Sequence, residues 1–269
     1  MSVDHYENFP VASLLMPAHL RPAVQAIYAF ARHADDIADE GNYSSDWRLQ
    51  RLQELDEDLD RLQHGGTCNH PLVSALVPHI LKHRLPVPAL RDLLSAFSQD
   101  VIKKRYQDFF ELSDYCARSA NPVGRLMLHL YQHVSPLNLQ QSDAICSALQ
   151  LINFWQDVAI DWDKDRIYLP LDDMGRFQVS ESDIQTQNVN ESWQALLRFQ
   201  ARRAREMLLA GSPLCKALGG RIGWELRFVV QGGLLILERI EQANCDIFRR
   251  RPVIKKADFP LLAWRALRM

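Results

Sequence analysis

The feature that most constrains the fold is an apolar stretch that carries three oxygen ligands at helical spacing. Asn153, Asp157 and Asp161 recur every four residues within residues 148–170, ALQLINFWQDVAIDWDKDRIYLP. Residues four apart lie on one face of an α-helix, so these side chains stack along that face. Most of the other residues are apolar or aromatic, and a carboxylate among such residues is costly unless a cation neutralises it. The stretch therefore predicts a helix that binds a cation.

A second acidic segment with the same periodicity lies near the start of the chain. Residues 26–40, AIYAFARHADDIADE, place Asp35 and Asp39 four residues apart, with Asp36 and Glu40 as a neighbouring pair. Such a segment alone is typical of the solvated end of a helix. Here apolar and aromatic residues precede the acidic ones, which indicates a helix with one buried face. Together the two acidic helices favour a shared site.

Two such helices facing each other would form a cavity rimmed by oxygen ligands. Mg²⁺ takes oxygen ligands and is commonly held by a few carboxylates together with substrate phosphates. We therefore expect more than one Mg²⁺ ion and a diphosphate, whose departure as a leaving group the metals would assist. The expected metal ligands are Asp35, Asp36, Asp39, Asn153, Asp157 and Asp161, and the expected catalytic residues among them are Asp35, Asp39, Asp157 and Asp161.

Cationic and phenolic side chains near the acidic segments are candidates to complete an anion site. Arg32 precedes the first acidic group, and Arg166 and Tyr168 follow the second. Arg105 and Tyr106 form a further pair in the middle of the chain. Each of these residues, taken alone, is more typical of a salt bridge or a surface position than of a ligand contact.

The rest of the chain indicates an all-α fold. Period-two alternation and hairpin dipeptides are scarce, whereas helical periodicity is widespread. The connections are short, and no linker or internal repeat divides the chain, so we expect residues 1–269 to form a single domain. The predicted helices cover residues 21–40, 46–64, 70–83, 87–104, 112–133, 139–165, 190–210, 215–247 and 255–267.

Composition narrows the classes of function. A formal net charge of −2 argues against a general nucleic-acid-binding protein. Five cysteines with no CxxC pair fit a reducing cytoplasm better than a disulfide scaffold or a zinc site. The N-terminus lacks the pattern of a signal peptide, and no segment has the roughly 18 successive apolar residues of a transmembrane helix. We expect a cytoplasmic protein.

Two segments leave alternatives open. Residues 249–269 combine seven arginines and lysines with apolar and aromatic residues, a pattern that fits either a helix lying in a membrane interface or a terminal helix packed on the domain. Contact with the inner face of a bacterial membrane is thus one expectation. Residues 166–189 form the longest irregular stretch, which fits either a lid or a surface connection with short helical turns.

Four segments of the chain carry a family resemblance. They are YAFARHADDIADE (28–40), RYQDFFELSDYCARSANPVG (105–124), LQLINFWQDVAIDWDKDRIYLP (149–170) and QANCDIFRRRP (242–252). In this order they resemble the signatures of the squalene and phytoene synthase family over nearly the whole chain. The resemblance implies an isoprenoid-synthase-type helical bundle around a central apolar cavity. It also implies Mg²⁺ and prenyl diphosphates held between two aspartate-rich helices.

The resemblance also assigns roles to residues of this sequence. The six oxygen ligands named above match the family's two metal-binding motifs. Tyr28 is a candidate for cation–π contact with a carbocation, together with Phe9, Phe30, Phe154 and Trp155, although ordinary packing is the commoner role of any one aromatic residue. The side chains implied to contact diphosphates are Arg32, Arg105, Tyr106, Arg166, Tyr168 and Arg250.

Two positions depart from the common family pattern. Gln156 stands where many members have arginine, and Gly232-Gly233 lie where many have a tyrosine. With ENFPVASLLMP at residues 7–17, these departures resemble the branch that converts presqualene diphosphate and water to hydroxysqualene in hopanoid biosynthesis. That branch implies partner enzymes that make presqualene diphosphate and reduce hydroxysqualene. Gln156 is then a candidate to position the water.

Two other functions stay open at this point. A relative of the same fold would condense two farnesyl diphosphates to presqualene diphosphate or a related head-to-head product. A catalytically silent relative would act in assembly or as a scaffold, but it would be expected to have lost metal ligands, and all six ligand positions are intact.

Overall fold

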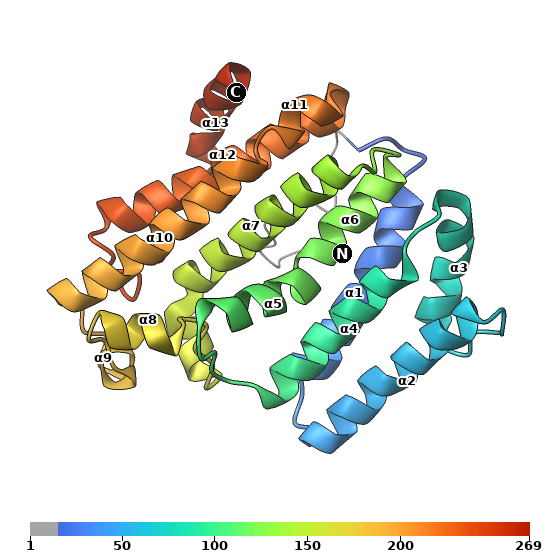
Figure 1. Ribbon diagram of the computed structural model, residues 1–269, viewed down its shortest axis with the longest axis horizontal. Coiled ribbons are helices and arrows are strands. Elements are labelled where there is room, and N and C mark those ends of the chain that lie inside the picture. The colour runs from blue at the N-terminus through green and yellow to red at the C-terminus, as the bar shows by residue number, and fades with distance from the viewer. Residues whose placement is uncertain (1–15) are drawn as a thin grey trace.

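The computed structural model describes residues 16–269, and its regular structure is helical (Figure 1). Within that range, the only extended pairing is an isolated bridge between Arg105 and Ile167. The prediction of an all-α fold is confirmed. The helices are α1 Arg21–Asp39, α2 Ser45–Gln63, α3 Pro71–His83, α4 Val87–Ile102, α5 Phe109–Ser119, α6 Asn121–Leu130, α7 Pro136–Asp163, α8 Leu171–Arg176, α9 Glu181–Gln185, α10 Glu191–Gly211, α11 Leu214–Leu218, α12 Gly220–Gln242 and α13 Phe259–Arg268, with a 3₁₀ turn at Lys256–Asp258.

The longest helix, α7, lies in the middle of the bundle (Figure 1). Ser135 caps its N-terminus by accepting a hydrogen bond from the backbone N–H of Asn138, and Pro136 occupies the first turn, where its missing N–H costs nothing. The helix packs against α10 on one side and α6 on the other. Because α7 is largely buried, each polar residue on it has to be satisfied by a specific partner.

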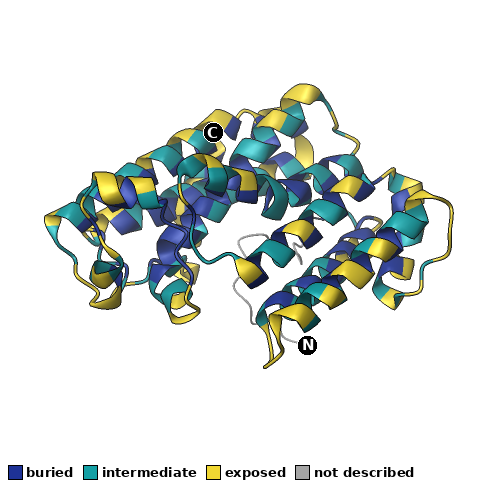
Figure 2. Ribbon diagram, turned by 60° about the horizontal axis from the view of Figure 1, so that its bottom comes forward, coloured by how far each residue is buried: buried dark blue, intermediate teal, exposed yellow. Residues whose placement is uncertain are grey.

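Two apolar clusters form the core (Figure 2). One cluster joins α1 to α4 and part of α6, and it includes the fully buried side chains of Phe30 and Leu59. The other joins α5, α7, α10 and α12 and includes Trp155 and Trp193, which are also fully buried. The two acidic helices belong to different clusters, with α1 in the first and α7 in the second.

Two of the predicted helices are each divided in the structure. Residues 112–133 form two helices, because Ala120 ends α5 and precedes the Asn121-Pro122 start of α6, where a proline cannot donate to the preceding turn. Residues 215–247 are interrupted at Gly219, whose φ of +59° lies in the left-handed region that glycine tolerates. The stretch 166–189 contains two short helices, α8 and α9, and residues 166–170 at its start are buried.

The C-terminal helix packs on α12. Arg265 donates to Glu238 at 2.8 and 2.9 Å, and Arg239 of α12 pairs with Asp258 before α13. In the described part of the chain, no helix is both long enough and apolar enough to cross a bilayer. Each of the five cysteines is a free thiol.

Candidate active site

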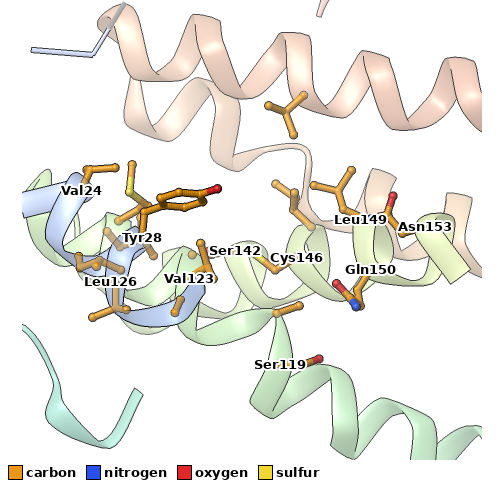
Figure 3. A pocket seen from close by; sticks show the side chains of 18 of the residues that line it. Val24, Tyr28, Ser119, Val123, Leu126, Ser142, Cys146, Leu149, Gln150 and Asn153 are labelled. Atoms are coloured by element: carbon orange, nitrogen blue, oxygen red, sulfur yellow. The ribbon is translucent and has the colours of Figure 1, made fainter. Parts of the chain in front are cut away.

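A cavity of about 500 Å³ lies between the two core clusters. It is walled by α1, α4, α5, α6, α7 and α12, and most of its surface is apolar (Figure 3). Gly124 lets α6 approach α7 at this wall, because a Cβ there would lie 2.2 Å from the Ser142 hydroxyl and 2.6 Å from the Cys146 sulfur. The apolar lining includes Val24, Ile27, Phe97, Val123, Leu126, Ile145, Leu149, Leu214, Leu218, Ile222, Leu226 and Val229.

The first acidic helix presents one polar stripe to this cavity. Tyr28, Arg32, Asp35 and Asp39 follow one another at spacings of four, three and four residues, and all four line the cavity. Arg32 pairs with Asp35 at 3.1 Å and with Asp36 at 2.7 Å. Asp36 itself is absent from the cavity lining, because it lies one residue further round the helix. Burial, reinforced by the neighbouring Asp39 carboxylate, raises the pKa of Asp35 to about 6.

The second acidic helix lines the cavity with residues that recur every three or four positions, from Ser142 to Asn153 (Figure 3). Beyond Asn153 the same face continues to Asp157, which receives two hydrogen bonds from Arg251, at 2.5 and 3.1 Å. Asp161 follows one turn later and is half-buried. Burial, reinforced by the Asp157 carboxylate, raises the pKa of Asp161 to about 7.

Arg166 joins the two acidic helices at the mouth of the cavity. It donates to both carboxylate oxygens of Asp39 and, at 3.2 Å, to the backbone carbonyl of Asp100. Lys164 also reaches Asp39, at 3.0 Å. Burial would raise the pKa of Asp39, but the hydrogen bond and positive charge of Arg166 outweigh it and hold that pKa below its usual value. The structure thus brings α1 and the end of α7 together, as the sequence predicted.

Asp100 on α4 is a site residue that the sequence analysis missed. It lines the cavity, is 7% exposed, and accepts hydrogen bonds from Tyr115 at 2.7 Å and Tyr168 at 3.4 Å. Burial raises its pKa to about 6 despite the Tyr115 hydroxyl. The Tyr168 ring stacks on Phe154, with centroids 3.8 Å apart. The sequence signal that could have identified Asp100 is the one used for α7: a carboxylate within an apolar helix.

The aromatic candidates are distributed unevenly about the cavity. Tyr28 and Tyr168 line it, and Phe154 supports Tyr168 from behind. Phe30 and Trp155 are fully buried and do not line it, so the structure gives them a packing role. Phe9 lies outside the described residues, as does most of the motif at residues 7–17.

The pair Arg105-Tyr106 has a structural role in place of the expected ligand contact. Arg105 forms two hydrogen bonds with Glu181, at 2.8 and 2.9 Å, and binds the backbone carbonyl of Asp165 at 2.6 Å. Tyr106 is 1% exposed, and its hydroxyl accepts a hydrogen bond from Gln99. Neither residue lines the cavity. These contacts tie the segment after α4 to α9 and to the turn after α7, which positions Arg166 and Tyr168.

Gln156 and Arg250 also lie away from the cavity lining. Gln156 is 2% exposed and donates from its amide nitrogen to the carbonyl of Pro252 at 2.7 Å. Arg250 is exposed, whereas the adjacent Arg251 binds Asp157. Within this basic run, the structure thus places Arg251 beside the second acidic helix. Pro252 directly follows Arg251, so the hydrogen bond from Gln156 to Pro252 holds the loop that carries Arg251.

The donors at the mouth fit a hard divalent cation. The metal candidates provide only carboxylate and amide oxygens, which suit Mg²⁺ and not soft metals. Burial raises the pKa values of Asp35, Asp100 and Asp161, so a bound cation would stabilise the charged forms of these carboxylates. Among residues 16–269, no three His, Cys, Asp or Glu side chains are already grouped as a metal site. Metal ligation by these residues therefore remains a proposal.

Comparison with known proteins identifies the family. The family model of squalene/phytoene synthases matches residues 3–258. The chain belongs to this family. It is 34% identical to the hydroxysqualene synthase of Rhodopseudomonas palustris, over 97% of this chain and 88% of that protein. It is 31% identical to a phytoene synthase of Arthrospira platensis, over 99% and 91% of the two chains.

A solved structure of this family shares the fold. The squalene synthase HpnC from Alicyclobacillus acidocaldarius superposes with a TM-score of 0.82 at 33% identity, covering 89% of this chain and 90% of that one. Squalene/phytoene synthases process prenyl diphosphates in isoprenoid biosynthesis, so the general chemistry of the site follows from membership. The relatives of this chain include both hydroxysqualene and phytoene synthases, so the particular reaction requires an argument from the site.

Proposed function

We propose that this protein is a hydroxysqualene synthase, a lyase that converts presqualene diphosphate and water to hydroxysqualene and diphosphate. The observation that carries the proposal is the division of one cavity into an oxygen- and cation-rich mouth and an apolar interior. A diphosphate leaves as an anion and needs neutralising charge, whereas the carbocation that remains needs a cavity from which stray water is excluded. The two parts of the cavity meet these opposite needs.

At the mouth, the chain would hold both the metal and the diphosphate. Asp35, Asp39 and Asn153 line the cavity, and they would hold Mg²⁺ together with Asp36, Asp157 and Asp161, which lie on the same two helices outside the lining. When bound, Mg²⁺ supplies positive charge that stabilises the departing diphosphate. Arg32 and Arg166 provide N–H donors at the same place. The C–O bond then breaks, and its electron pair leaves with the diphosphate.

Inside the cavity, the walls favour rearrangement of the carbocation. Aliphatic side chains from α6, α7 and α12 exclude water from its path. The rings of Tyr28 and Tyr168 line the polar end, where their faces can stabilise positive charge. Stacking on Phe154 fixes the orientation of Tyr168.

Water capture needs a polar group in this apolar wall. Ser119 and Gln150 both line the cavity (Figure 3), and the Ser119 hydroxyl oxygen is buried with no hydrogen-bond partner among residues 16–269. A buried polar atom without a partner is the usual site of an ordered water. We assign the positioning of the reacting water to Ser119 and Gln150 in place of Gln156. Addition of this water to the carbocation, with loss of one proton to the released diphosphate or to Asp100, gives the alcohol.

The proposed reaction places the protein between two others. A prenyl-condensing enzyme must supply presqualene diphosphate, and a reductase must consume hydroxysqualene to give squalene in hopanoid synthesis. A reducing cytoplasm, at the inner side of the bacterial membrane, fits the five free thiols and an apolar product.

Separate incubations with three prenyl diphosphates test the proposal. Purified protein with Mg²⁺ is incubated separately with presqualene, farnesyl and geranylgeranyl diphosphates, and the extracted products are analysed by gas chromatography and mass spectrometry. We expect hydroxysqualene from presqualene diphosphate. Product from only the shorter diphosphates would establish the alternative, head-to-head condensation, which the phytoene synthase relatives support. No turnover of any substrate would favour a non-catalytic assembly role.

A further inference from the structure

The C-terminal helix α13 is apolar on two opposite faces. Leu262 and Ala266 face α12 and are 3% and 0% exposed. Successive residues of an α-helix are rotated by about 100°, so Trp264 lies opposite this packed face, with Leu267 about 60° to one side of it and Leu261 about 60° to the other. These three side chains are 50%, 67% and 38% exposed. We call Leu261, Trp264 and Leu267 the outer face of α13.

A second exposed tryptophan, on α12, lies beside the end of α13. Arg227 donates to the backbone carbonyl of Ala266 at 3.3 Å, and its guanidinium lies 4.9 Å from the ring centroid of Trp224. Trp224 is itself 38% exposed, so an exposed tryptophan of α12 lies beside the end of α13. Arg268 lies 4.0 Å over the ring of Trp264. Two exposed indoles, each beside an arginine, form an apolar surface with cationic edges.

Positive charge predominates in the segment that carries α13, although Arg249, Arg251 and Arg265 are paired with Asp246, Asp157 and Glu238. Residues 249–269 contain seven arginines and lysines and one acidic residue, in a chain whose formal net charge is −2. That acidic residue, Asp258, is paired with Arg239. Lys255 and Lys256, just before α13, are exposed. A slightly acidic chain thus concentrates positive charge beside its exposed apolar helix.

We propose that the outer face of α13 docks on the surface of an anionic lipid bilayer. An amphipathic helix with arginine and lysine beside tryptophan and leucine inserts shallowly between head groups, and anionic lipids attract its cations. Tryptophan favours this interfacial depth. A second copy of the chain is a poorer occupant, because a two-fold interface would place this basic surface against itself.

The position of the outer face fits the proposed function, on which this step of the inference rests. Ile222 and Leu226 line the cavity from α12, while Trp224 is exposed on another side of the same turns. Docking through Trp224 and α13 would hold this end of the cavity near the bilayer. An apolar thirty-carbon product is far more soluble in a bilayer than in water.

Vesicle flotation without substrate tests the docking. Full-length protein is mixed with vesicles of phosphatidylglycerol and phosphatidylcholine, or of phosphatidylcholine alone, and the bound fraction is measured at rising salt. We expect binding to the anionic vesicles that weakens with salt. The variant Trp264→Ser/Leu267→Ser should bind at least about tenfold more weakly. The variant Lys255→Gln/Lys256→Gln should lose about fivefold per lysine on anionic vesicles only.

A matched control separates docking from general hydrophobicity. Leu81 on α3 is 72% exposed and lies far along the chain from α13, so Leu81→Ser should bind vesicles like the unchanged protein. Absence of binding to anionic vesicles, or an equal loss in Leu81→Ser, would overturn the proposal. A dimer in sedimentation velocity that Trp264→Ser/Leu267→Ser dissociates would instead identify a second copy as the occupant. None of these readouts depends on turnover, so failure of the proposed reaction would leave them unaffected.

Discussion

Two glutamines of α7, Gln150 and Gln156, make a direct test of how the site is built. Gln150 lines the cavity, whereas Gln156 points to the C-terminal loop and donates to Pro252 at 2.7 Å. Arg251, which precedes Pro252 in that loop, binds Asp157. Gln156→Met removes the hydrogen bond while keeping a side chain of similar length. We therefore expect this substitution to loosen the hold of Arg251 on Asp157 without altering the cavity.

The magnitude follows from the hydrogen bonds of Gln156. Losing the amide donor leaves the Pro252 carbonyl without this partner, which costs about 1–3 kcal/mol when the carbonyl stays buried. The Gln156 carbonyl oxygen, however, has no hydrogen-bond partner among residues 16–269, and replacing it by an apolar group recovers part of that cost. The expected loss in the free energy of unfolding is about 1 kcal/mol. If the whole of this loss of about 1 kcal/mol weakens the docking of the loop, kcat/KM falls about fivefold.

Two measurements check this expectation. Urea titration followed by circular dichroism gives the change in stability, and steady-state kinetics with product analysis gives kcat, KM and the ratio of alcohol to hydrocarbon. Gln156→Met should raise KM and lower stability, while the alcohol remains the product. Gln150→Met should leave stability within about 0.5 kcal/mol and should reduce the alcohol fraction, because a polar wall group is lost.

The opposite pattern would refute the reasoning. If Gln156→Met kept its stability and KM but formed hydrocarbon in place of alcohol, then Gln156 would position the water, as the sequence alone suggested. If both variants behaved alike, the division of roles between the two glutamines would be wrong.

Three further predictions address the carboxylates. Asp35→Asn and Asp157→Asn should each reduce turnover at least about 10²-fold in single-turnover assays, and unchanged rates would contradict a role in leaving-group departure. Chelation by EDTA should abolish turnover, with recovery on adding Mg²⁺, and should leave the helical circular dichroism unchanged because the core clusters contain no metal ligand. Asp58→Asn should destabilise the protein by about 2 kcal/mol at pH 7. Since the folded-state pKa of Asp58 is lowered, this difference should persist above about pH 4 and vanish as the pH falls through the folded-state value in acid unfolding.

Helical spacing predicted which residues share a face, but not which distant residue each one contacts. The spacing of Asp35 and Asp39 was sufficient to place both on one face of α1, because a helix fixes neighbours three and four residues apart, and both line the cavity. The partner of Arg105 is 76 residues away and that of Gln156 is 96 residues away. Such pairings depend on how α9 and the C-terminal loop pack, and no local pattern encodes them.

The break between α5 and α6 shows a second limit. Residues 112–133 were predicted as one helix because the apolar periodicity continues through the break at Pro122. In the structure Ala120 closes one helix and opens the next. The separate direction of α6 allows Val123 and Leu126 to line the cavity. A proline inside a periodic segment therefore deserved more weight than the continuity of the pattern.

Two buried carboxylates, Asp58 and Asp100, differ in a way that the sequence context already separates. Asp58 is 1% exposed, but burial is outweighed by hydrogen bonds from the backbone N–H groups of Asn69 and His70 and by Arg61, so its pKa is lowered. Asp100 is 7% exposed, and burial prevails, so its pKa is raised.

The flanking sequence differs in the same sense. Asp58 lies in a helix rich in charged residues, some of which can pair with its carboxylate. Asp100, in contrast, ends the largely apolar run DLLSAFSQD of α4. A carboxylate in apolar surroundings keeps an unbalanced charge, and that charge is what a cationic ligand would bind. Applied to every helix of the chain, the criterion that singled out α7 would also have identified Asp100.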